Sequence, residues 1–325
     1  MNKKNIAVVG AGYWGKNLVR VFAELGVLAA VCDFNGELAD HLAKEHGAIS
    51  KSFDAVLSDP SIGGVAIAAP AALHAELATS ALEAGKHVFV EKPLALRVED
   101  ATKVVELAES RGLTLMVGHL LQYHPAFLAI KDRVNAGLIG ELQYVYSNRL
   151  NLGKIRKEED ILWSFAPHDI SMILKLVGEE PNSVSCASSS FLSPDIADVT
   201  VTHLAFPSGV QGHVFVSWLH PFKEQRLIVV GSKGMLTFDD GALLPDKVRY
   251  YAHRIEWNED LPVPVRGEGE AIQVPAAEPL GLELQHFLDC IASGKTPITD
   301  GREGLAVLSV LERATNVMNS GRAIR

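Results

Sequence analysis

Residues 6–15 read Ile-Ala-Val-Val-Gly-Ala-Gly-Tyr-Trp-Gly, and an amphipathic segment near residues 16–25 follows directly. The glycines have the spacing Gly-x-Gly-x-x-Gly at a strand-to-helix turn. In such a turn the first glycine permits the tight bend, the second lets the backbone approach a pyrophosphate, and the third lets helix and strand pack closely. The stretch predicts the first unit of a dinucleotide-binding Rossmann fold, with the cofactor-binding candidates Gly10, Gly12, Tyr13, Trp14 and Gly15.

A second interpretation of the same stretch is a phosphate-binding P-loop, because residues 10–16 also fit Gly-x-x-x-x-Gly-Lys. That motif continues with Ser or Thr, whose hydroxyl holds magnesium, and this chain has Asn17 there instead. The Rossmann interpretation is therefore favoured.

Short β-branched runs alternate with longer amphipathic segments as far as about residue 120. The runs are residues 6–9, 27–32, 64–68, 87–90 and 114–117, and the helical segments lie near residues 16–25, 38–46, 74–84, 98–111 and 126–136. Uninterrupted apolar runs indicate strands that are buried on both faces, which is typical of a parallel sheet with helices on each side. We expect an α/β Rossmann domain with a doubly wound parallel sheet at residues 1–120.

The pattern changes after about residue 140. Residues 199–206 and 210–218 alternate around Pro207-Ser208-Gly209 and predict a hairpin, and further strand-like runs cover residues 226–230 and 235–238. Helices are expected at residues 167–177, 282–292 and 304–318. These features predict an α+β domain with a large open, mainly antiparallel sheet at residues 121–325, whose last helices pack back on the first domain.

Composition excludes several classes of protein. The net charge of −9 argues against a nucleic-acid partner, which needs a basic face. The three cysteines are far apart, as is usual for free thiols in a reducing compartment. The charged residues 1–5 resemble the start of a signal peptide, but the apolar run after them is too short, and no stretch approaches the roughly 20 apolar residues of a membrane span. We expect a cytoplasmic protein with no membrane partner, and the histidine spacing predicts no metal.

The carboxyl ends of parallel strands form the ligand-binding edge of an open sheet. Asp33 ends the second predicted strand, 18 residues after Gly15, where a carboxylate can accept both hydroxyls of the adenosine ribose. It would repel a 2′-phosphate, and neither Phe34 nor Asn35 supplies a cation. The cofactor expected is therefore NAD, with NADP less favoured, and Asp33 and Phe34 are binding candidates.

Other strand ends add further candidates to this edge. A lysine between a glutamate and a proline is unusual for a simple turn, and Pro93 biases Lys92 toward extended geometry. At a dry rim such a lysine loses its proton more readily. The cofactor-binding candidates at these ends are Ala69, Pro70, Glu91, Lys92 and His119.

Three motifs together resemble the signatures of the Gfo/Idh/MocA oxidoreductases. They are the glycine turn, Ala69-Pro70-x-x-x-His74 and Glu91-Lys92-Pro93, and the resemblance extends to residues 296–304 before the last helix. It implies that Lys92 is catalytic beside the nicotinamide and that Pro70 and His74 line the dinucleotide site. It also implies a homo-oligomer formed through the C-terminal sheet.

The family's second catalytic element is Asp-x-x-x-His, and here Ser164 stands where the aspartate is usual, with His168 as the histidine. Pro167 suits the first position of a helix, which would place His168 in the first turn, where the helix dipole keeps an imidazole neutral. Lys92 and His168 are the catalytic candidates, with a structural histidine as the alternative. The sequence leaves open which of the two accepts the proton.

A basic segment precedes the His168 helix. The substrate candidates there are Arg149, Lys154 and Arg156, followed by Lys157, and Ser164, His168 and Lys92 complete the set. The segment is either a solvated loop or a clamp for a diphosphate. With residues 162–169 it resembles family members that oxidise UDP-N-acetylglucosamine-type sugars or their uronates at C3. Alternatives are a free-sugar or inositol dehydrogenase and a dinucleotide-binding regulator without turnover.

Overall fold

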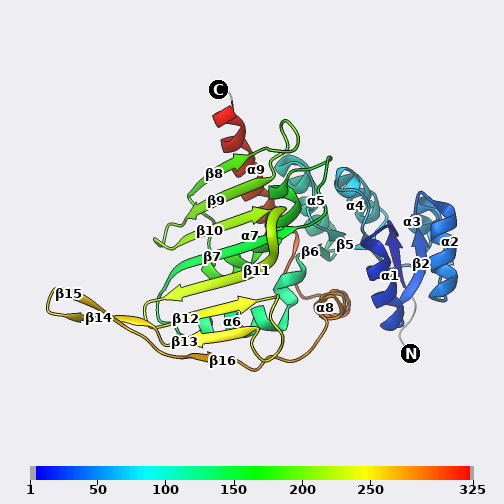
Figure 1. The fold of residues 1–325 in the computed structure, drawn as a ribbon. Helices are drawn as coiled ribbons and strands as arrows, with labels where there is room; N and C mark the ends of the chain where they lie inside the picture. The colour runs from blue at the N-terminus through cyan, green and yellow to red at the C-terminus, as the bar shows by residue number, and fades with distance from the viewer. Residues whose placement is uncertain (1–4, 323–325) are drawn as a thin grey trace. The chain divides into compact units, whose positions relative to one another are not determined.

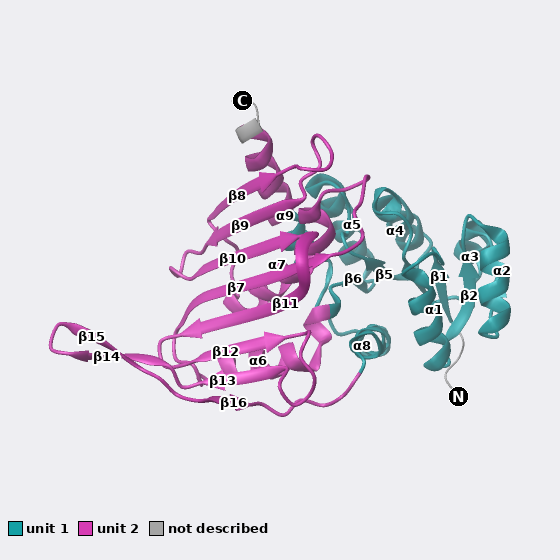
Figure 2. Cartoon of the chain, in the orientation of Figure 1, with its two compact units in different colours: residues 1–120, 278–308 teal, residues 121–277, 309–325 magenta. Residues whose placement is uncertain are grey.

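The chain, described here over residues 5–322 in a computed structural model, divides into two compact units. Unit 1 consists of residues 1–120 and 278–308, and unit 2 of residues 121–277 and 309–325 (Figure 2). Residues 278–308 thus group with the N-terminal unit, although they follow the second one in sequence. Residues 1–4, part of the segment that resembles the start of a signal peptide but is followed by too short an apolar run, lie outside the described residues.

Unit 1 is built on six parallel strands in the order β3-β2-β1-β4-β5-β6 (Figure 1). They are β1 (Ile6–Val9), β2 (Leu28–Cys32), β3 (Ile49–Ser50), β4 (Gly64–Ile67), β5 (His87–Glu91) and β6 (Leu115–Gly118). Every residue of β1, β4 and β6 is buried. The parallel sheet predicted from the uninterrupted apolar runs is confirmed.

Within residues 5–322, five α-helices connect consecutive strands of unit 1, and two more come from later in the sequence. They are α1 (Gly15–Glu24), α2 (Gly36–Glu45), α3 (Phe53–Ser58), α4 (His74–Glu83), α5 (Val98–Arg111), α8 (Pro279–Ser293) and the first part of α9 (Gly301–Arg322). The sequence did not predict β3 or α3, because elements of two and six residues are too short to show a period.

Unit 2 contains an eight-stranded sheet in the order β16-β13-β12-β11-β7-β10-β9-β8. The strands are β7 (Leu142–Leu152), β8 (Ser183–Ser189), β9 (Val199–Ala205), β10 (Gln211–Ser217), β11 (Leu219–Gly231), β12 (Met235–Asp239), β13 (Val248–Tyr251) and β16 (Gly269–Ala271). β7 and β10 are parallel, and every other neighbouring pair is antiparallel. The mainly antiparallel sheet, including the hairpin of β9 and β10, is confirmed.

One face of this sheet is covered by helix. Residues alternate between buried and exposed along β9, and α7 (Ile161–Val177) lies against β7, β9 and β10. α6 (Pro125–Asn135) lies against β12, so this predicted helix belongs to unit 2. A separate hairpin of β14 (Arg254–Asn258) and β15 (Leu261–Val265) extends away from the sheet (Figure 1). No helix within residues 5–322 is both long and apolar enough to cross a membrane.

Candidate active site

The glycine turn between β1 and α1 leaves room for a ligand only at its middle glycine. Gly10 has φ +89°, and a Cβ there would lie 2.6 Å from the Ala68–Ala69 backbone, so a side chain is excluded. A Cβ at Gly15 would overlap the Gly10 carbonyl oxygen, whereas one at Gly12 would meet nothing within 4 Å. Tight packing beneath an open backbone is the cradle that a pyrophosphate requires, so the turn fits NAD.

Asp33 follows β2 at the same edge of the sheet. Its Oδ2 accepts a hydrogen bond from the Ala11 amide (2.6 Å), and its Oδ1 accepts one from the Asn35 amide (2.8 Å). A carboxylate can accept about four hydrogen bonds, so each oxygen keeps a free site for a ribose hydroxyl. The neighbouring Phe34 side chain is fully exposed.

The ends of β4 and β5 are tied together by a histidine. His74 is 2% exposed, and its ring nitrogens lie 2.7 Å from the Pro93 carbonyl oxygen and 2.8 Å from that of Ala69. Burial lowers the pKa of His74, while the two carbonyls favour the protonated ring. Both nitrogens are used on the backbone, so His74 positions the loops around Lys92, whereas Pro70 is exposed.

His119, after β6, is also engaged within the protein. It is 2% exposed, and its Nδ1 lies 2.6 Å from Oε2 of Glu303 at the start of α9. Glu283 on α8 is 1% exposed, and burial, together with the charges of Glu91 and Glu303, raises its pKa well above the ordinary value. Neither Glu283 nor Glu303 is among the site residues predicted from the sequence. The available signal was a glutamate between Leu282 and Leu284 in a predicted helix.

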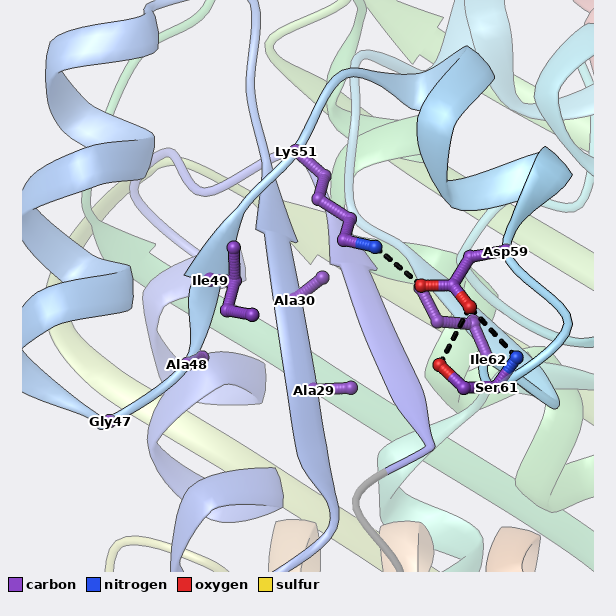
Figure 3. A pocket seen from close by; sticks show the side chains of 9 residues that line it. All are labelled: Ala29, Ala30, Gly47, Ala48, Ile49, Lys51, Asp59, Ser61 and Ile62. Carbon is purple, nitrogen blue, oxygen red and sulfur yellow. Dashed lines mark hydrogen bonds and ion pairs between the residues drawn. The ribbon is translucent and has the colours of Figure 1, made fainter.

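Unit 1 also has a hollow of about 270 Å³ beside the amino-terminal half of β2. It is lined by Ala29, Ile49 and Ile62, among others, and contains the ion pair of Lys51 and Asp59 (Figure 3). None of the residues predicted to bind the cofactor lines this hollow. No group of three or more His, Cys, Asp or Glu side chains in the described part of the chain is arranged to hold a metal ion.

In unit 2, the helix that carries His168 begins earlier than the sequence indicated. Asp160 caps α7, and its Oδ1 accepts a hydrogen bond from the Trp163 amide (3.1 Å), so Pro167 lies inside the helix. His168 is the eighth helical residue, and the favourable effect of the helix dipole is limited to the first turn. The prediction that His168 lies in the first turn of the helix is therefore wrong. Ser164 and His168 share one face of α7, because they are four residues apart.

The Arg149 side chain on β7 is held by a buried carboxylate. Its Nε and Nη2 donate to the Asp169 oxygens at 2.7 and 3.2 Å, and Ser147 Oγ donates to the same carboxylate (2.5 Å). Asp169 is 1% exposed. The Arg149 guanidinium is thus already bound by Asp169. Lys154, Arg156 and Lys157 are the other cations of the basic segment.

That segment is not uniformly basic. Arg156 Nε lies 3.1 Å from Glu159 Oε1. The Lys157 amide donates to Glu158, which lowers the pKa of that carboxyl, with smaller contributions from Lys154 and Arg156. Three cations therefore stand beside Glu158, Glu159 and Asp160.

A glycine turn after β1, a carboxylate after β2 and a lysine after β5 thus lie at one edge of the sheet, as in dinucleotide-binding oxidoreductases. Residues 4–119 match "Oxidoreductase family, NAD-binding Rossmann fold", and residues 127–237 match "GFO/IDH/MocA C-terminal domain". The chain belongs to the Gfo/Idh/MocA family.

Two relatives are similar over nearly the whole chain. Scyllo-inositol 2-dehydrogenase (NAD(+)) from Bacillus subtilis is 30% identical, over 98% of this chain and 95% of the relative. UDP-N-acetylglucosamine 3-dehydrogenase from Acidithiobacillus ferrooxidans is 28% identical, over 93% of both chains. A solved structure of the latter enzyme aligns with a TM-score of 0.86 and 26% identity, over 98% of this chain and 99% of that one.

Proposed function

We propose that the protein oxidises a secondary alcohol of a sugar and that Lys92 and His168 handle the hydroxyl proton. The observation that carries this proposal is the position of Lys92 immediately after β5, at the same carboxyl edge as the glycine turn and Asp33. Bound NAD would accept the hydride. Gly10, Gly12 and Gly15 would hold its pyrophosphate and Asp33 its ribose, with Tyr13, Trp14, Phe34, Ala69 and Pro70 beside them.

In this proposal one of the two side chains removes the hydroxyl proton as the C–H hydride leaves, and a ketone forms. Lys92 and His168 belong to different units. Ser164, one helical turn before His168, provides a hydroxyl for a hydrogen-bond relay and no carboxylate. A catalytic lysine also argues against the regulator alternative.

For the substrate we propose a UDP-linked N-acetylhexosamine or its uronate, oxidised at C3. Similarity to the UDP-N-acetylglucosamine enzyme over nearly the whole chain supports this choice. Lys154, Arg156 and Lys157 would provide the positive charge for the diphosphate. Arg149 is the weakest member of this set, because Asp169 already binds its guanidinium at two points.

A free sugar or inositol is the second candidate, for two reasons. The inositol enzyme is more similar to this chain in sequence than the UDP-N-acetylglucosamine enzyme is. The acidic residues 158–160 also offset the positive charge of the basic segment. Turnover of a panel of UDP-sugars, free sugars and inositols, followed by NADH absorbance, separates the two candidates. Activity with UDP-sugars, together with a higher KM for them in Arg156→Ala, supports binding of the diphosphate by the basic segment. Activity with inositols alone contradicts it.

We also propose a homo-oligomer formed through the unit 2 sheet, and a cytoplasmic location. The proposed interface is supported by a cluster of rings on the sheet. The ring centroids of Tyr144, Tyr146 and His213 lie within about 6.3 Å of one another. The location is supported by the three free cysteines. Sedimentation of the wild type and of Tyr146→Glu tests the interface. An unchanged molecular mass contradicts it.

A further inference from the structure

Two side chains at the carboxyl edge of the unit 1 sheet join turns that are separated by a whole strand. Trp14, the last residue before α1, donates its Nε1–H to Glu91 Oε1 (2.5 Å). Trp14 belongs to the turn after β1, and Glu91 ends β5, while β4 lies between these strands in the sheet. The hydrogen bond therefore bridges the end of β4.

The Glu91 carboxylate is also fixed from the side of β6. A Cβ added at Gly118, the last residue of β6, would lie 2.9 Å from Glu91 Oε2 and 3.1 Å from its Cδ. The glycine thus provides the space that the carboxylate occupies. Trp14, from the turn after β1, and Gly118, from β6, thus both meet the Glu91 side chain at the end of β5.

We propose that Trp14 and Glu91 form a clamp that fastens the dinucleotide-binding turn to the loop carrying Lys92. Glu91 is covalently joined to Lys92, and Trp14 lies between the glycines that cradle the pyrophosphate. A dinucleotide that orders the turn therefore orders the lysine loop, and the reverse is also true. The expected effect on dinucleotide affinity does not depend on the proposed function. The expected effect on turnover rests on the proposed catalytic role of Lys92.

The clamp has a titratable acceptor. Burial raises the pKa of Glu91 to about 7, while the Trp14 indole, Lys92 and His119 lower it. An ionised carboxylate accepts a stronger hydrogen bond than a neutral carboxyl group. The clamp is therefore firmer above pH 7 and weaker below it.

The other carboxylates that face this region do not replace Glu91 as the titrating group. Neither carboxylate oxygen of Glu283 on α8 has a hydrogen-bond partner among residues 5–322, and a bare buried charge is very unfavourable, so Glu283 keeps its proton. Glu303 on α9 is held by His119. Glu91 thus changes charge beside a neutral Glu283 and a paired Glu303.

The test is the Kd for NAD of the full-length protein, measured by calorimetry at pH 6 and pH 8. Trp14→Phe keeps an aromatic ring and removes the donor, and we expect it to weaken NAD binding at pH 8 by about three- to tenfold. Glu91→Gln keeps an acceptor without a charge, so the Kd of this variant should no longer depend on pH. Trp257→Phe, at an exposed position on β14, is the matched control and should bind as wild type does.

A second readout requires no dinucleotide. The tryptophan emission of the free protein should change with a midpoint near pH 7, and this change should be absent in Trp14→Phe and in Glu91→Gln. If folded Trp14→Phe binds NAD as tightly as wild type at both pH values, the clamp is refuted. The proposed function is tested separately by Lys92→Met, in which turnover should be lost while NAD binding stays normal.

Discussion

The buried ion pair of Arg149 and Asp169 determines whether this arginine is a structural residue or a substrate ligand. Asp169 is 1% exposed and the Arg149 side chain 12%, and the arginine makes two hydrogen bonds to the carboxylate. Arg149→Met removes the guanidinium and leaves the carboxylate with Ser147 as its remaining donor. Removing one partner of a buried pair costs about 3–5 kcal/mol, because the other charge stays buried.

Urea unfolding followed by tryptophan fluorescence measures this loss, since Trp163, Trp218 and Trp257 all lie in unit 2. At a slope of about 2 kcal/mol per M urea, the midpoint should fall by roughly 1.5–2.5 M. Arg156→Met is the matched control. Its side chain is 41% exposed and pairs with Glu159, so it should cost less than about 1 kcal/mol.

The double variant Arg149→Met/Asp169→Leu should regain much of the lost stability, because it removes both buried charges together. An unchanged urea midpoint in Arg149→Met, combined with loss of binding to a UDP-sugar, would refute this reasoning. Arg149 would then be a substrate ligand after all.

Three further predictions concern the cofactor, the chemistry and pH. NAD should bind at least about tenfold more tightly than NADP, or 1.4 kcal/mol, and Asp33→Ser should narrow that gap, whereas equal calorimetric affinities in the wild type contradict the role of Asp33. Lys92→Met and His168→Ala should each lower kcat by roughly 10²–10⁴ with NAD affinity nearly intact, and the double variant should lose little more. Near-normal kcat in either single variant counts against its assignment. In the unfolded chain Glu283 releases its proton above its ordinary pKa of 4.5, whereas the folded protein keeps this proton to a higher pH. The stability of the folded protein therefore falls as the pH rises above about 4.5. Glu283→Gln should therefore raise the melting temperature at pH 8 and change it little near pH 4, and equal shifts at both pH values exclude this linkage.

The parallel sheet and the glycine turn at its edge could be predicted from the sequence for physical reasons. Strands buried on both faces leave uninterrupted apolar runs, and a ligand-binding turn needs glycine where backbone must approach backbone, as at Gly10 and Gly15. Local patterns of this kind are set by neighbouring residues and are therefore visible in one sequence.

Features that depend on contacts distant in sequence could not be predicted. The sequence shows Arg149 as one cation of a basic segment, and only the folded sheet and helix bring it against Asp169. Pro167 was interpreted as a helix start, but α7 begins at Ile161, after the Asp160 cap, and continues through Pro167. The bond from Trp14 to Glu91 joins residues 77 positions apart.

The reaction proposed for this NAD-binding protein is hydride transfer from a sugar to NAD, with Lys92 handling the hydroxyl proton. The most direct test is NADH formation by the wild type and by Lys92→Met with a panel of UDP-N-acetylhexosamines, their uronates, free sugars and inositols. We expect NADH with at least one UDP-sugar, formed at a rate that is lower by roughly 10²–10⁴ in the variant. No NADH from any member of the panel, in a protein that binds NAD normally, would contradict the claim and favour a regulator.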